Sequence, residues 1–541
     1  MPTLEFKGKQ HIYAHHLTVP YRPLEPDESK SCNPIDTDDN LIIHGDNLHA
    51  LKALLPRCAN RIKCIYIDPP YNTGNGEWEY NDNVNSPLMQ AWFDQHSPVD
   101  SEDLERHDKW LCMMWPRLHL LKELLTEDGT IFISIDHNEQ HHLRMLMDEI
   151  FGEQNIVANF TWWSKYTLSN DSKTVSYQHE NILSYAKNLE VCQIGVLPRT
   201  PEMDKSYKNP DEDPKGPWKA TPLHAKSGRD EDRYSLKFPN GVTWHCPEGR
   251  FPRYTEKGLT ELYNDGQLYF GRSGKSQPNK KTYLSEVKAG KTVGSLWPYQ
   301  EVGSTHQANE ELASVMGKGV FNNPKGTKLI QRVFQTANLS SDDIVLDSFA
   351  GSGTTAHAVL ALNKEDDGNR KFILIECEDY ADTITAERIR RVINGVPEAR
   401  DDALREGLGG SFTYCNLGKP IEVESMLTGE ALPAYAALAA NLLYTTSGVS
   451  VGADTLEAQN DDGLFHSDDK NDYYLIYKPD LEYLRGNAAI LNLERAERIR
   501  DTSRENDRKA IVYAAGNYIG QRELTQMGII FCQLPDALHE R

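Results

Sequence analysis

Residues 344–355 decide the fold of this chain, and they read IVLDSFAGSGTT. An apolar run typical of a buried strand leads into a turn with Gly351 and Gly353, and helix-forming residues follow. Glycines let the backbone bend tightly and approach a ligand, while the start of a helix offers free N–H groups. Glu376 closes the next apolar run, 25 residues after Gly351, near the position of the acid that binds ribose in dinucleotide folds. The stretch therefore predicts a nucleotide-type cradle at the end of a strand.

The glycine turn by itself does not identify the nucleotide. No lysine follows Gly353, which disfavours a P-loop that binds ATP, and Ala356 is a permitted variant of the dinucleotide pattern. An isolated Gly-x-Gly is equally compatible with a plain turn from a strand into a helix. The interpretation therefore depends on a second motif.

That second motif is Asp68-Pro69-Pro70-Tyr71, which follows the apolar run at residues 64–67. Because the prolines restrict the backbone and lack N–H groups, we expect the carbonyl groups around them to have no neighbouring N–H partners. A carboxylate and a nearby carbonyl can accept both hydrogens of an exocyclic amino group, and a tyrosine offers a face on which a flipped base can stack. Two prolines alone would indicate only a turn, but beside the glycine motif they favour chemistry on an amino group.

The two motifs resemble the signatures of the amino-group DNA methyltransferases that use S-adenosylmethionine. Those signatures are a Phe-x-Gly-x-Gly cofactor loop, here at residues 349–353, and an Asp-Pro-Pro-Tyr catalytic loop. The catalytic loop comes first in the chain, which is similar to the permuted order of the β class. Residues 71–75, 321–325 and 354–358 most resemble modification subunits of type III restriction systems. The resemblance covers residues 37–400 and implies the amino group of adenine as the acceptor.

The resemblance implies a role for each matched position. Asp68 and the carbonyl of Pro69 would hold the target amino group, with Pro70 in the same loop. Tyr71 would stack on the flipped base, and residues 179–185 resemble a family strand beside that base. The cofactor-binding residues that it implies are Asp46, Phe321, Lys325, Asp347, Phe349, Gly351, Gly353, Thr354 and Glu376.

Apolar runs alternate with helical stripes along much of the chain. Strands are expected at residues 41–43, 64–67, 131–135, 182–185, 344–346 and 372–375, and helices at 48–55, 110–125, 143–150, 329–333 and 354–362. The expected fold class is α/β: a doubly wound, Rossmann-like methyltransferase sheet, circularly permuted and interrupted by an inserted target-recognition domain, with a C-terminal α/β domain. The expected domains are an N-terminal arm (1–36), a catalytic half (37–190), the insertion (191–318), a cofactor-binding half (319–400) and the C-terminal domain (401–541).

The charge is unevenly distributed. The 541 residues include 58 Lys and Arg against 80 Asp and Glu, a net charge of -22, which excludes a uniformly basic nucleic-acid coat protein. Counted by segment, the charge is -13 for residues 1–160, +5 for 161–300 and -14 for 301–541. We expect the basic segment to contact phosphates, although a solvated loop would also carry such lysines. The nucleic-acid-binding residues predicted there are Arg272, Lys275, Lys280, Lys281 and Lys288.

The sequence also limits the compartment and the metals. It has no apolar run near the roughly 18 residues of a membrane helix and no apolar N-terminal signal. Nine cysteines without a Cys-x-x-Cys pair suggest neither a disulfide framework nor a zinc ribbon, so we expect a cytoplasmic protein without membrane attachment. His137, His141 and His142 are expected to be ordinary surface residues, and no metal is expected, because nothing in the sequence completes a tetrahedral set.

The sequence thus predicts a site-specific DNA methyltransferase that methylates the N6 amino group of adenine in duplex DNA after base flipping, with S-adenosylmethionine as cofactor. It would act alone or as the modification subunit of a restriction system. An RNA adenine methyltransferase and a DNA-binding specificity subunit with vestigial activity are the alternatives. The expected partners are double-stranded DNA, a second copy of the chain as in β-class homodimers, and a restriction subunit with nuclease and helicase functions.

Overall fold

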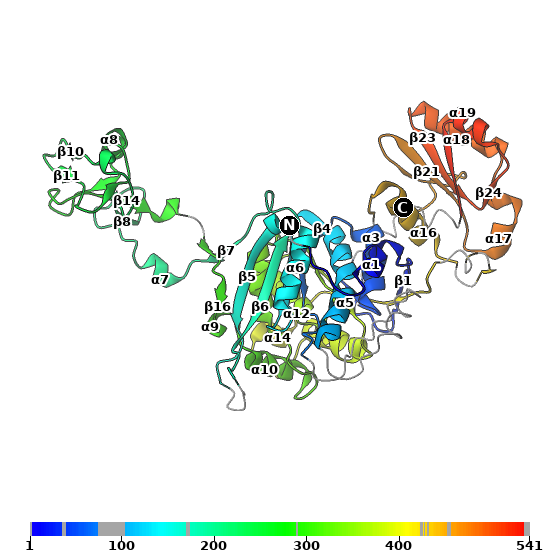
Figure 1. The fold of residues 1–541 in the computed structure, drawn as a ribbon, viewed down its shortest axis with the longest axis horizontal. Coiled ribbons are helices and arrows are strands. Elements are labelled where there is room, and N and C mark those ends of the chain that lie inside the picture. Colours follow the sequence, from blue (N-terminus) through cyan, green and yellow to red (C-terminus); the bar gives the residue numbers. More distant parts are fainter. Residues whose placement is uncertain are drawn as a thin grey trace. The chain divides into compact units, whose positions relative to one another are not determined.

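The computed structural model of the chain forms two compact units (Figure 1). Unit 1 comprises Met1–Gly195 and Gly294–Arg541, and unit 2 comprises Val196–Val293. The residues described by the structure are 3–34, 39–73, 103–168, 174–287, 290–421, 426, 428–429, 432–451 and 456–534, with only the backbone of 103–105. Among them, no helix has both the length and the apolar character needed to cross a membrane.

Unit 1 is built on a ten-stranded sheet with the order β1-β19-β2-β18-β17-β3-β4-β6-β5-β16. The six neighbours from β19 to β4 are parallel, and β6 pairs antiparallel with both β4 and β5. Because the parallel strands are buried on both faces, their sequences read as apolar runs. The strands are β1 (Leu24–Pro26), β2 (Leu41–His44), β3 (Ile62–Ile67), β4 (Leu125–Ile135), β5 (Ile156–Trp163), β6 (His179–Ala186), β16 (Leu296–Trp297), β17 (Ile344–Asp347), β18 (Lys371–Glu376) and β19 (Thr413–Leu417).

Two groups of helices cover this sheet. In the first, α5 contacts both α3 and α6, and these helices share one apolar core with alternate residues of the central strands. That core contains no residue of α11, α12 or α13, which contact one another in series. The doubly wound α/β fold predicted from the sequence is confirmed, as are the predicted strands and helices. The helices are α3 (Asn47–Cys58), α5 (Asp103–Leu124), α6 (Gln140–Phe151), α11 (Thr327–Ala337), α12 (Thr354–Asp366) and α13 (Glu387–Asn394).

The order of the strands joins the two sequence motifs. Strand β17 lies between β18 and β3, and it is parallel to both. The carboxyl ends of β3 and β17 therefore reach the same edge of the sheet, although the whole of unit 2 separates them in the sequence. In open α/β sheets this edge is where ligands bind. The loops that begin at Asp68 and after Asp347 meet there.

The N-terminal segment, predicted to be an arm at residues 1–36, is folded into unit 1 where the structure describes it. It contains α1 (Lys9–Ile12), α2 (His15–Thr18) and β1, which pairs with β19. Ile12 belongs to the main core, and the buried ammonium group of Lys9 lies 2.7 Å from Glu149 of α6. The prediction was wrong because apolar residues spaced among prolines and charges gave no periodic signal, yet they cover the exposed flank of α5.

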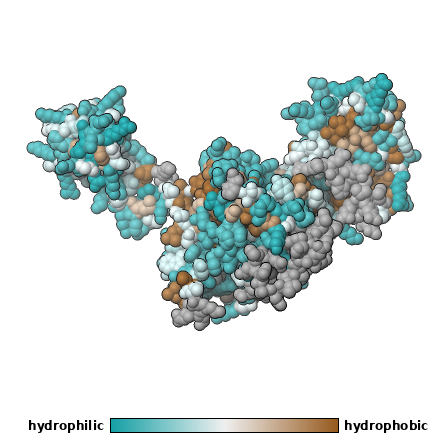
Figure 2. All heavy atoms as spheres, viewed as in Figure 1, coloured by the Kyte–Doolittle hydropathy of each residue, from teal (hydrophilic) through white to brown (hydrophobic). Residues whose placement is uncertain are grey.

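Unit 2 has its own small core and several short strands. Its largest sheet has the order β13-β14-β8, and β14 is antiparallel to both neighbours. Six buried residues form the core beneath α8: Leu223, Phe238, Trp244, Leu259, Leu268 and Phe270. The face of this unit seen in Figure 2 is mostly hydrophilic. Its elements include α7 (Pro201–Asp204), α8 (Glu256–Asn264), β7 (Val196–Pro198), β8 (Trp218–Pro222), β10 (Ser235–Lys237), β11 (Thr243–His245), β13 (Leu268–Tyr269), β14 (Asn279–Tyr283) and β15 (Gly290–Thr292).

The compact unit is shorter than the insertion expected at residues 191–318. After residue 293 the chain adds β16 to the edge of the large sheet beside β5. It then forms α9 (Tyr299–Val302) and α10 (Thr305–Met316), and α10 contacts α13. Irregular, glycine-rich sequence around these elements gave no sign of the boundary, because an edge strand of two residues has no period to detect.

The C-terminal part of the chain forms a second α/β layer within unit 1. Its sheet has the order β20-β21-β23-β25, and two apolar clusters flank that sheet. The predicted domain started at residue 401, but β19 belongs to the large sheet, so this layer begins after residue 417. Its elements include α16 (Tyr435–Ser447), α17 (Leu481–Arg485), α18 (Leu493–Glu505), α19 (Gln521–Met527), β20 (Leu464–Ser467), β21 (Asn471–Ile476), β23 (Lys509–Ala514) and β25 (Ile529–Gln533).

Candidate active site

A cavity of about 340 Å³ lies at the carboxyl edge of β3 and β17. Three segments far apart in the sequence line it: the loop after β3, residues 321–325, and the glycine turn after β17. The predicted site residues along its wall are Asp68, Pro70, Tyr71, Phe321, Lys325, Asp347, Phe349, Gly351 and Thr354. The structure thus brings together both sequence motifs and the segment of Phe321 and Lys325, which the resemblance assigned to cofactor binding.

Asp68 belongs to a cluster of four polar side chains, of which Asp68, Tyr71 and Lys325 line this cavity. The ammonium group of Lys325 donates hydrogen bonds to Asp68 Oδ2 at 2.6 Å and to the Tyr71 hydroxyl at 3.0 Å. The Tyr71 hydroxyl lies 2.8 Å from Asp68 Oδ1 and 2.9 Å from Glu180 Oε2, so its single proton is shared between two carboxylates. Glu180, at the start of β6, is 3.6 Å from Lys325. The cluster closes around Asp68 and holds its carboxylate in one orientation.

Burial and charge govern the protonation of this cluster. Burial works against a charged Lys325, but Asp68 and Glu180 outweigh it and raise the pKa of the lysine. Burial, together with the same two carboxylates, raises the pKa of Tyr71 well above its ordinary value. At neutral pH the lysine is therefore charged and the tyrosine is neutral. One ammonium group stands against two carboxylates, which leaves the cavity with a negative charge suited to a cationic ligand.

The carbonyl groups of the catalytic loop are only partly free. The Pro70 carbonyl accepts a hydrogen bond of 2.7 Å from the indole N–H of Trp110, so the expectation that the carbonyls around the prolines have no partner is wrong for Pro70. Proline removes local N–H donors, but Trp110 reaches the loop from α5 across the tertiary structure. Within the described residues, the Pro69 carbonyl accepts no hydrogen bond. It remains available to a ligand.

The backbone of the glycine turn packs tightly against Phe321 and Glu376 at Gly351. Gly351 has a φ of +51°, and a Cβ there would lie 3.2 Å from the ring of Phe321. Its N–H donates to Glu376 Oε2 at 2.7 Å, and its carbonyl accepts from the Thr385 hydroxyl at 2.6 Å. The ring of Phe321 meets Tyr380 edge-on, with centroids 5.6 Å apart. Any side chain at position 351 would strain the turn and fill the cradle.

Two buried acids end the strands that flank this turn. Asp347 accepts from the Phe349 N–H at 3.1 Å and from the Thr355 hydroxyl at 2.5 Å. The carboxylate of Glu376 accepts hydrogen bonds from the N–H groups of Gly351, Cys377 and Glu378. Glu376 is not among the residues that line the cavity. Burial raises the pKa of Asp347 to about 7, and it also raises the pKa of Glu376 to about 7. Both acids therefore titrate near neutrality.

Arg388 of α13 donates hydrogen bonds to the glycine turn, and no sequence motif pointed to this role. This fully buried side chain of α13 donates to the Ser352 carbonyl at 3.3 Å and to the Thr354 hydroxyl at 2.8 Å. Its other end is 3.1 Å from Glu311 Oε1. The only signal that could have pointed to it is that Arg388 is placed among the residues that form the apolar face of α13, next to Ile389. It fixes the turn in the orientation that exposes Gly351 to the cavity.

Asp46 and Gly353 lie beside the cavity and do not line it. The carboxylate of Asp46 caps α3 by accepting from the Leu48 N–H at 2.9 Å. Burial opposes its charge, but the Arg117 guanidinium, 3.3 Å away, lowers the pKa of Asp46 overall. Gly353 ends the turn with a φ of +77° immediately before α12. Asp46 thus fixes the start of α3 and Gly353 the start of α12, both next to the site.

The basic residues predicted to bind nucleic acid divide into different environments in unit 2. Lys281 is buried and forms ion pairs with Asp211 at 2.7 Å and Asp213 at 2.5 Å, so its prediction as a surface contact was wrong. Successive residues of a strand point to opposite faces, and Lys280 is therefore on the other face of β14, 5.5 Å from the Tyr254 ring. Arg272 and Lys275 are exposed. Lys288 lies outside the described residues.

Comparison with known proteins agrees with this geometry. Residues 62–387 match the model of a family described as DNA methylase, which is more than half of the chain. The span runs from the start of β3 to the start of α13 and includes every wall of the cavity. The chain belongs to this family of DNA methylases.

Relatives of known name give the same assignment. The Type III restriction-modification enzyme StyLTI Mod subunit of Salmonella typhimurium is 37% identical over 71% of this chain and 61% of its own length. The EcoPI Mod subunit of Escherichia phage P1 is 32% identical over 72% of this chain and 67% of its length. The Type II methyltransferase M.KpnI of Klebsiella pneumoniae is 31% identical over 65% of this chain and 83% of its length. The match thus spans about three fifths of the StyLTI subunit.

We predict that Arg388→Ala lowers both the stability of unit 1 and its affinity for a ligand in the cavity. Removing the guanidinium takes away the ion pair with Glu311 and the hydrogen bonds to the Ser352 carbonyl and the Thr354 hydroxyl, and breaking a buried ion pair costs about 3–5 kcal/mol. Thermal unfolding of the full chain measures the first effect. Arg390→Ala is the matched control, because Arg390 lies on the same helix but pairs with Asp382, and its ligand affinity should equal that of the wild type.

Proposed function

We propose that this chain is a DNA methyltransferase that transfers a methyl group from S-adenosylmethionine to the N6 amino group of adenine in duplex DNA. The observation that carries the proposal is the meeting of Asp68, Pro70 and Tyr71 with the glycine turn at one cavity. An amino-group acceptor site and a nucleotide cradle side by side suit the transfer of a group between two bound molecules. Positioning of this kind is a major source of rate acceleration.

The residues around the cavity fit S-adenosylmethionine. A volume of about 340 Å³ is in the usual range for small-molecule sites, and the cradle at Gly351 has room for a ligand only because no Cβ is present. The net negative charge and the acids Asp347 and Glu376 match a ligand that carries a sulfonium and an ammonium group. Phe321, Phe349 and Tyr380 would supply apolar surface for its adenosine. When bound, S-adenosylmethionine supplies an electrophilic methyl group on sulfur.

The target amino group would be held by the catalytic loop. Its two hydrogens would be accepted by the Asp68 carboxylate and by the free carbonyl of Pro69, which keeps the nitrogen lone pair directed at the methyl carbon. The nitrogen forms its new bond to carbon as the carbon–sulfur bond breaks, and the amino group then loses one proton. Asp68 is the acceptor placed to take that proton and pass it to water.

Lys325 and Glu180 would control the availability of Asp68. When no nucleobase is bound, the ammonium group of Lys325 donates a hydrogen bond to Asp68 Oδ2. The amino group of an incoming adenine must therefore replace that hydrogen bond. Glu180 and the Tyr71 hydroxyl remain within reach of the lysine and can keep its charge paired. We therefore assign Lys325 to the amino-acceptor site and not to the cofactor element alone.

Double-stranded DNA is the proposed substrate, with unit 2 as the target-recognition element. Unit 2 has 18 Lys and Arg against 13 Asp and Glu, a charge of +5, whereas the chain as a whole has -22. A basic unit in an otherwise acidic chain attracts phosphates to its own surface. The target adenine must leave the duplex to reach Asp68, and flipping costs on the order of a few kcal/mol.

The names of the relatives support the finer parts of the proposal. Three Mod subunits of type III enzymes are among them, which favours a modification subunit that works with a restriction subunit, and M.KpnI keeps a stand-alone enzyme open. A homodimer in the cytoplasm remains part of the proposal. Digestion of methylated DNA to nucleosides distinguishes N6-methyladenine from N4-methylcytosine, and the latter product would contradict adenine specificity. Structured RNA in the same assay tests the RNA alternative.

We predict that Asp68→Ala abolishes methyl transfer while the chain still binds S-adenosylmethionine. Without the carboxylate, the amino group is neither oriented nor relieved of its proton, and kcat should fall at least about 10³-fold. Transfer of a labelled methyl group to duplex DNA measures the rate, and calorimetry measures cofactor binding. The matched control is Asp136→Ala, which removes a carboxylate outside the cavity lining. Transfer that survives Asp68→Ala would overturn the assignment, and a chain that binds DNA but no cofactor would be a vestigial specificity subunit.

We predict that cofactor affinity rises with pH and reaches a plateau above about pH 8. The carboxyl groups of Asp347 and Glu376 have pKa values raised to about 7, so below pH 7 they are protonated and lose the charge that favours a cation. Each proton that must leave on binding weakens affinity up to about tenfold per pH unit. Calorimetry between pH 6 and 8.5 measures the slope. Asp347→Asn should reduce it, because Glu376 alone would still titrate, and an unchanged slope would show that Asp347 does not titrate on binding.

We predict that the triple variant Arg272→Ala, Lys275→Ala, Lys280→Ala weakens binding of duplex DNA and reduces its salt dependence. Each lost phosphate contact lowers the slope of log affinity against log salt by about 1. Fluorescence anisotropy at several salt concentrations measures the slope, and cofactor affinity should stay constant. The charge-retaining variant Arg272→Lys, Lys275→Arg, Lys280→Arg is the control. An equal loss in both variants would show that these residues act through folding and not through charge.

A further inference from the structure

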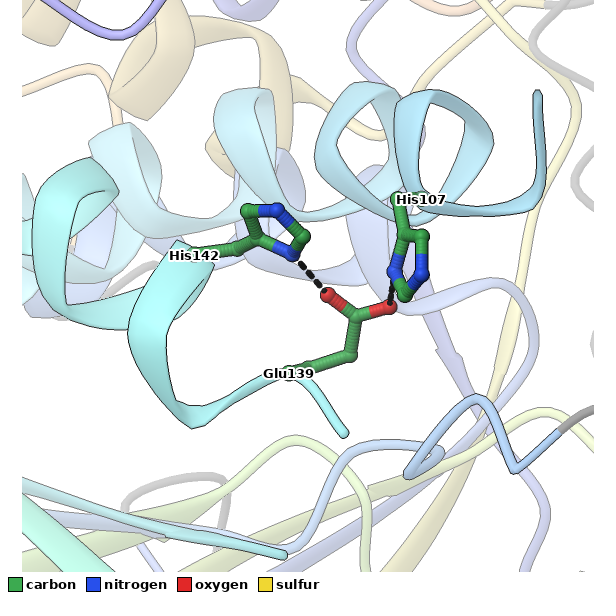
Figure 3. A group of neighbouring side chains, drawn as sticks. All are labelled: His107, Glu139 and His142. Atoms are coloured by element: carbon green, nitrogen blue, oxygen red, sulfur yellow. Dashed lines mark hydrogen bonds and ion pairs between the residues drawn. The ribbon is translucent and has the colours of Figure 1, made fainter. Parts of the chain in front are cut away.

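Three potential metal ligands converge behind the catalytic loop. Figure 3 shows the side chains of His107, Glu139 and His142 pointing toward one another. His107 comes from the first turns of α5, Glu139 precedes α6, and His142 is in the first turn of α6. One ligand atom from each residue lies within 4.8 Å of the others.

The carboxylate at the centre of this group is completely buried. Glu139 has 0% side-chain exposure, whereas His107 and His142 are 20% and 23% exposed. The expectation that His142 is an ordinary surface residue was therefore wrong, because it packs on a buried acid of its own helix start. Oε1 of Glu139 is 2.5 Å from His107 Nδ1, and its Oε2 is 2.8 Å from His142 Nδ1. Although Glu139 precedes a helix, its side chain accepts no hydrogen bond from the helix N–H groups. The carboxylate is directed at the imidazoles instead.

The spacing of these residues suits a metal ion. Glu139 and His142 are separated by three positions, so they lie on one side of the first turn of α6. The same Glu-x-x-His arrangement directs both side chains to a metal in helical carboxylate proteins. Two imidazole nitrogens and one carboxylate oxygen are also the ligand set of zinc sites that keep an open fourth position.

The electrostatics favour a cation at this place. A buried carboxylate is costly unless opposite charge or hydrogen bonds accompany it, and a metal ion would supply opposite charge. A divalent ion bound by both neutral histidines would compensate that charge and satisfy three ligands at once. The oxygen of Asn72, a buried residue whose amide group contacts Glu139, has no hydrogen-bond partner in the described residues. Rotation of that amide group would present its oxygen as a fourth ligand.

We propose that His107, Glu139 and His142 bind a divalent transition-metal ion of the zinc type. The site is independent of the methyl-transfer chemistry proposed above and would act on the structure of the catalytic loop. Asn72 directly follows Tyr71, has a φ of +54° and contacts Glu139 through its amide group. An ion on Glu139 thus joins α5 and α6 and holds the residue next to Tyr71 in a strained backbone conformation.

The test is zinc binding by the full chain after treatment with a chelator. Calorimetry should give one site in the wild type, and His107→Ala, His142→Ala should weaken that site at least about 100-fold. Zinc should also raise the thermal midpoint of the wild type but not that of the double variant. Cobalt in place of zinc reports the ligands by its visible spectrum, since thiolates from the nine cysteines would add an intense near-ultraviolet band.

His137→Ala is the matched control, because this histidine is exposed in the same segment but stacks on Tyr177. It should bind zinc as the wild type does. If the double variant does not fold, Glu139→Gln keeps the size and most hydrogen bonds of the carboxylate, and zinc affinity should still fall at least about tenfold. Wild-type binding no tighter than that of these variants would overturn the proposal and leave a hydrogen-bonded cluster without a metal.

Discussion

The parallel pairing of β17 with β3 is the constraint on which the rest of the site depends. The loop after β3 carries Asp68, and the loop after β17 carries the glycine turn. Because the two strands are parallel neighbours, both loops begin at the same edge of the sheet. Neither loop is a site alone. Unit 2, inserted between the two strands in the sequence, can vary in structure without altering their register, because that register is set by hydrogen bonds within the sheet.

Three charged side chains lie close together at the cavity formed in this way. Asp68, Glu180 and Lys325 come from three segments and are largely removed from water, so each depends on the others for compensation. This mutual dependence keeps Asp68 oriented before any ligand arrives. Buried Arg388 likewise holds the neighbouring glycine turn in place through its hydrogen bonds. Different elements therefore hold the charged groups at Asp68 and the backbone of the glycine turn.

Charge also separates the two units. The lysine-rich strand β14 seemed from its composition to be a phosphate-binding surface, but alternation along the strand places Lys281 in an ion-paired core and Lys280 near the surface. Counting charges along a segment therefore overestimates the basic surface. The +5 of unit 2 still contrasts with the acidic remainder of the chain, and the contrast rests on exposed residues such as Arg272 and Lys275.

The sequence by itself determined the doubly wound fold, the two loops and their order, because buried parallel strands and glycine turns leave strong local patterns. Resemblance placed residues 179–185 beside the target base, but the sequence could not determine the contacts of Glu180, Arg388 and the cluster at Glu139, since these residues act through partners tens to hundreds of positions away. Nor could it tell that the Pro70 carbonyl is occupied by Trp110. Local patterns report which face of an element is apolar, whereas the pairing of buried polar groups is settled only when the elements pack.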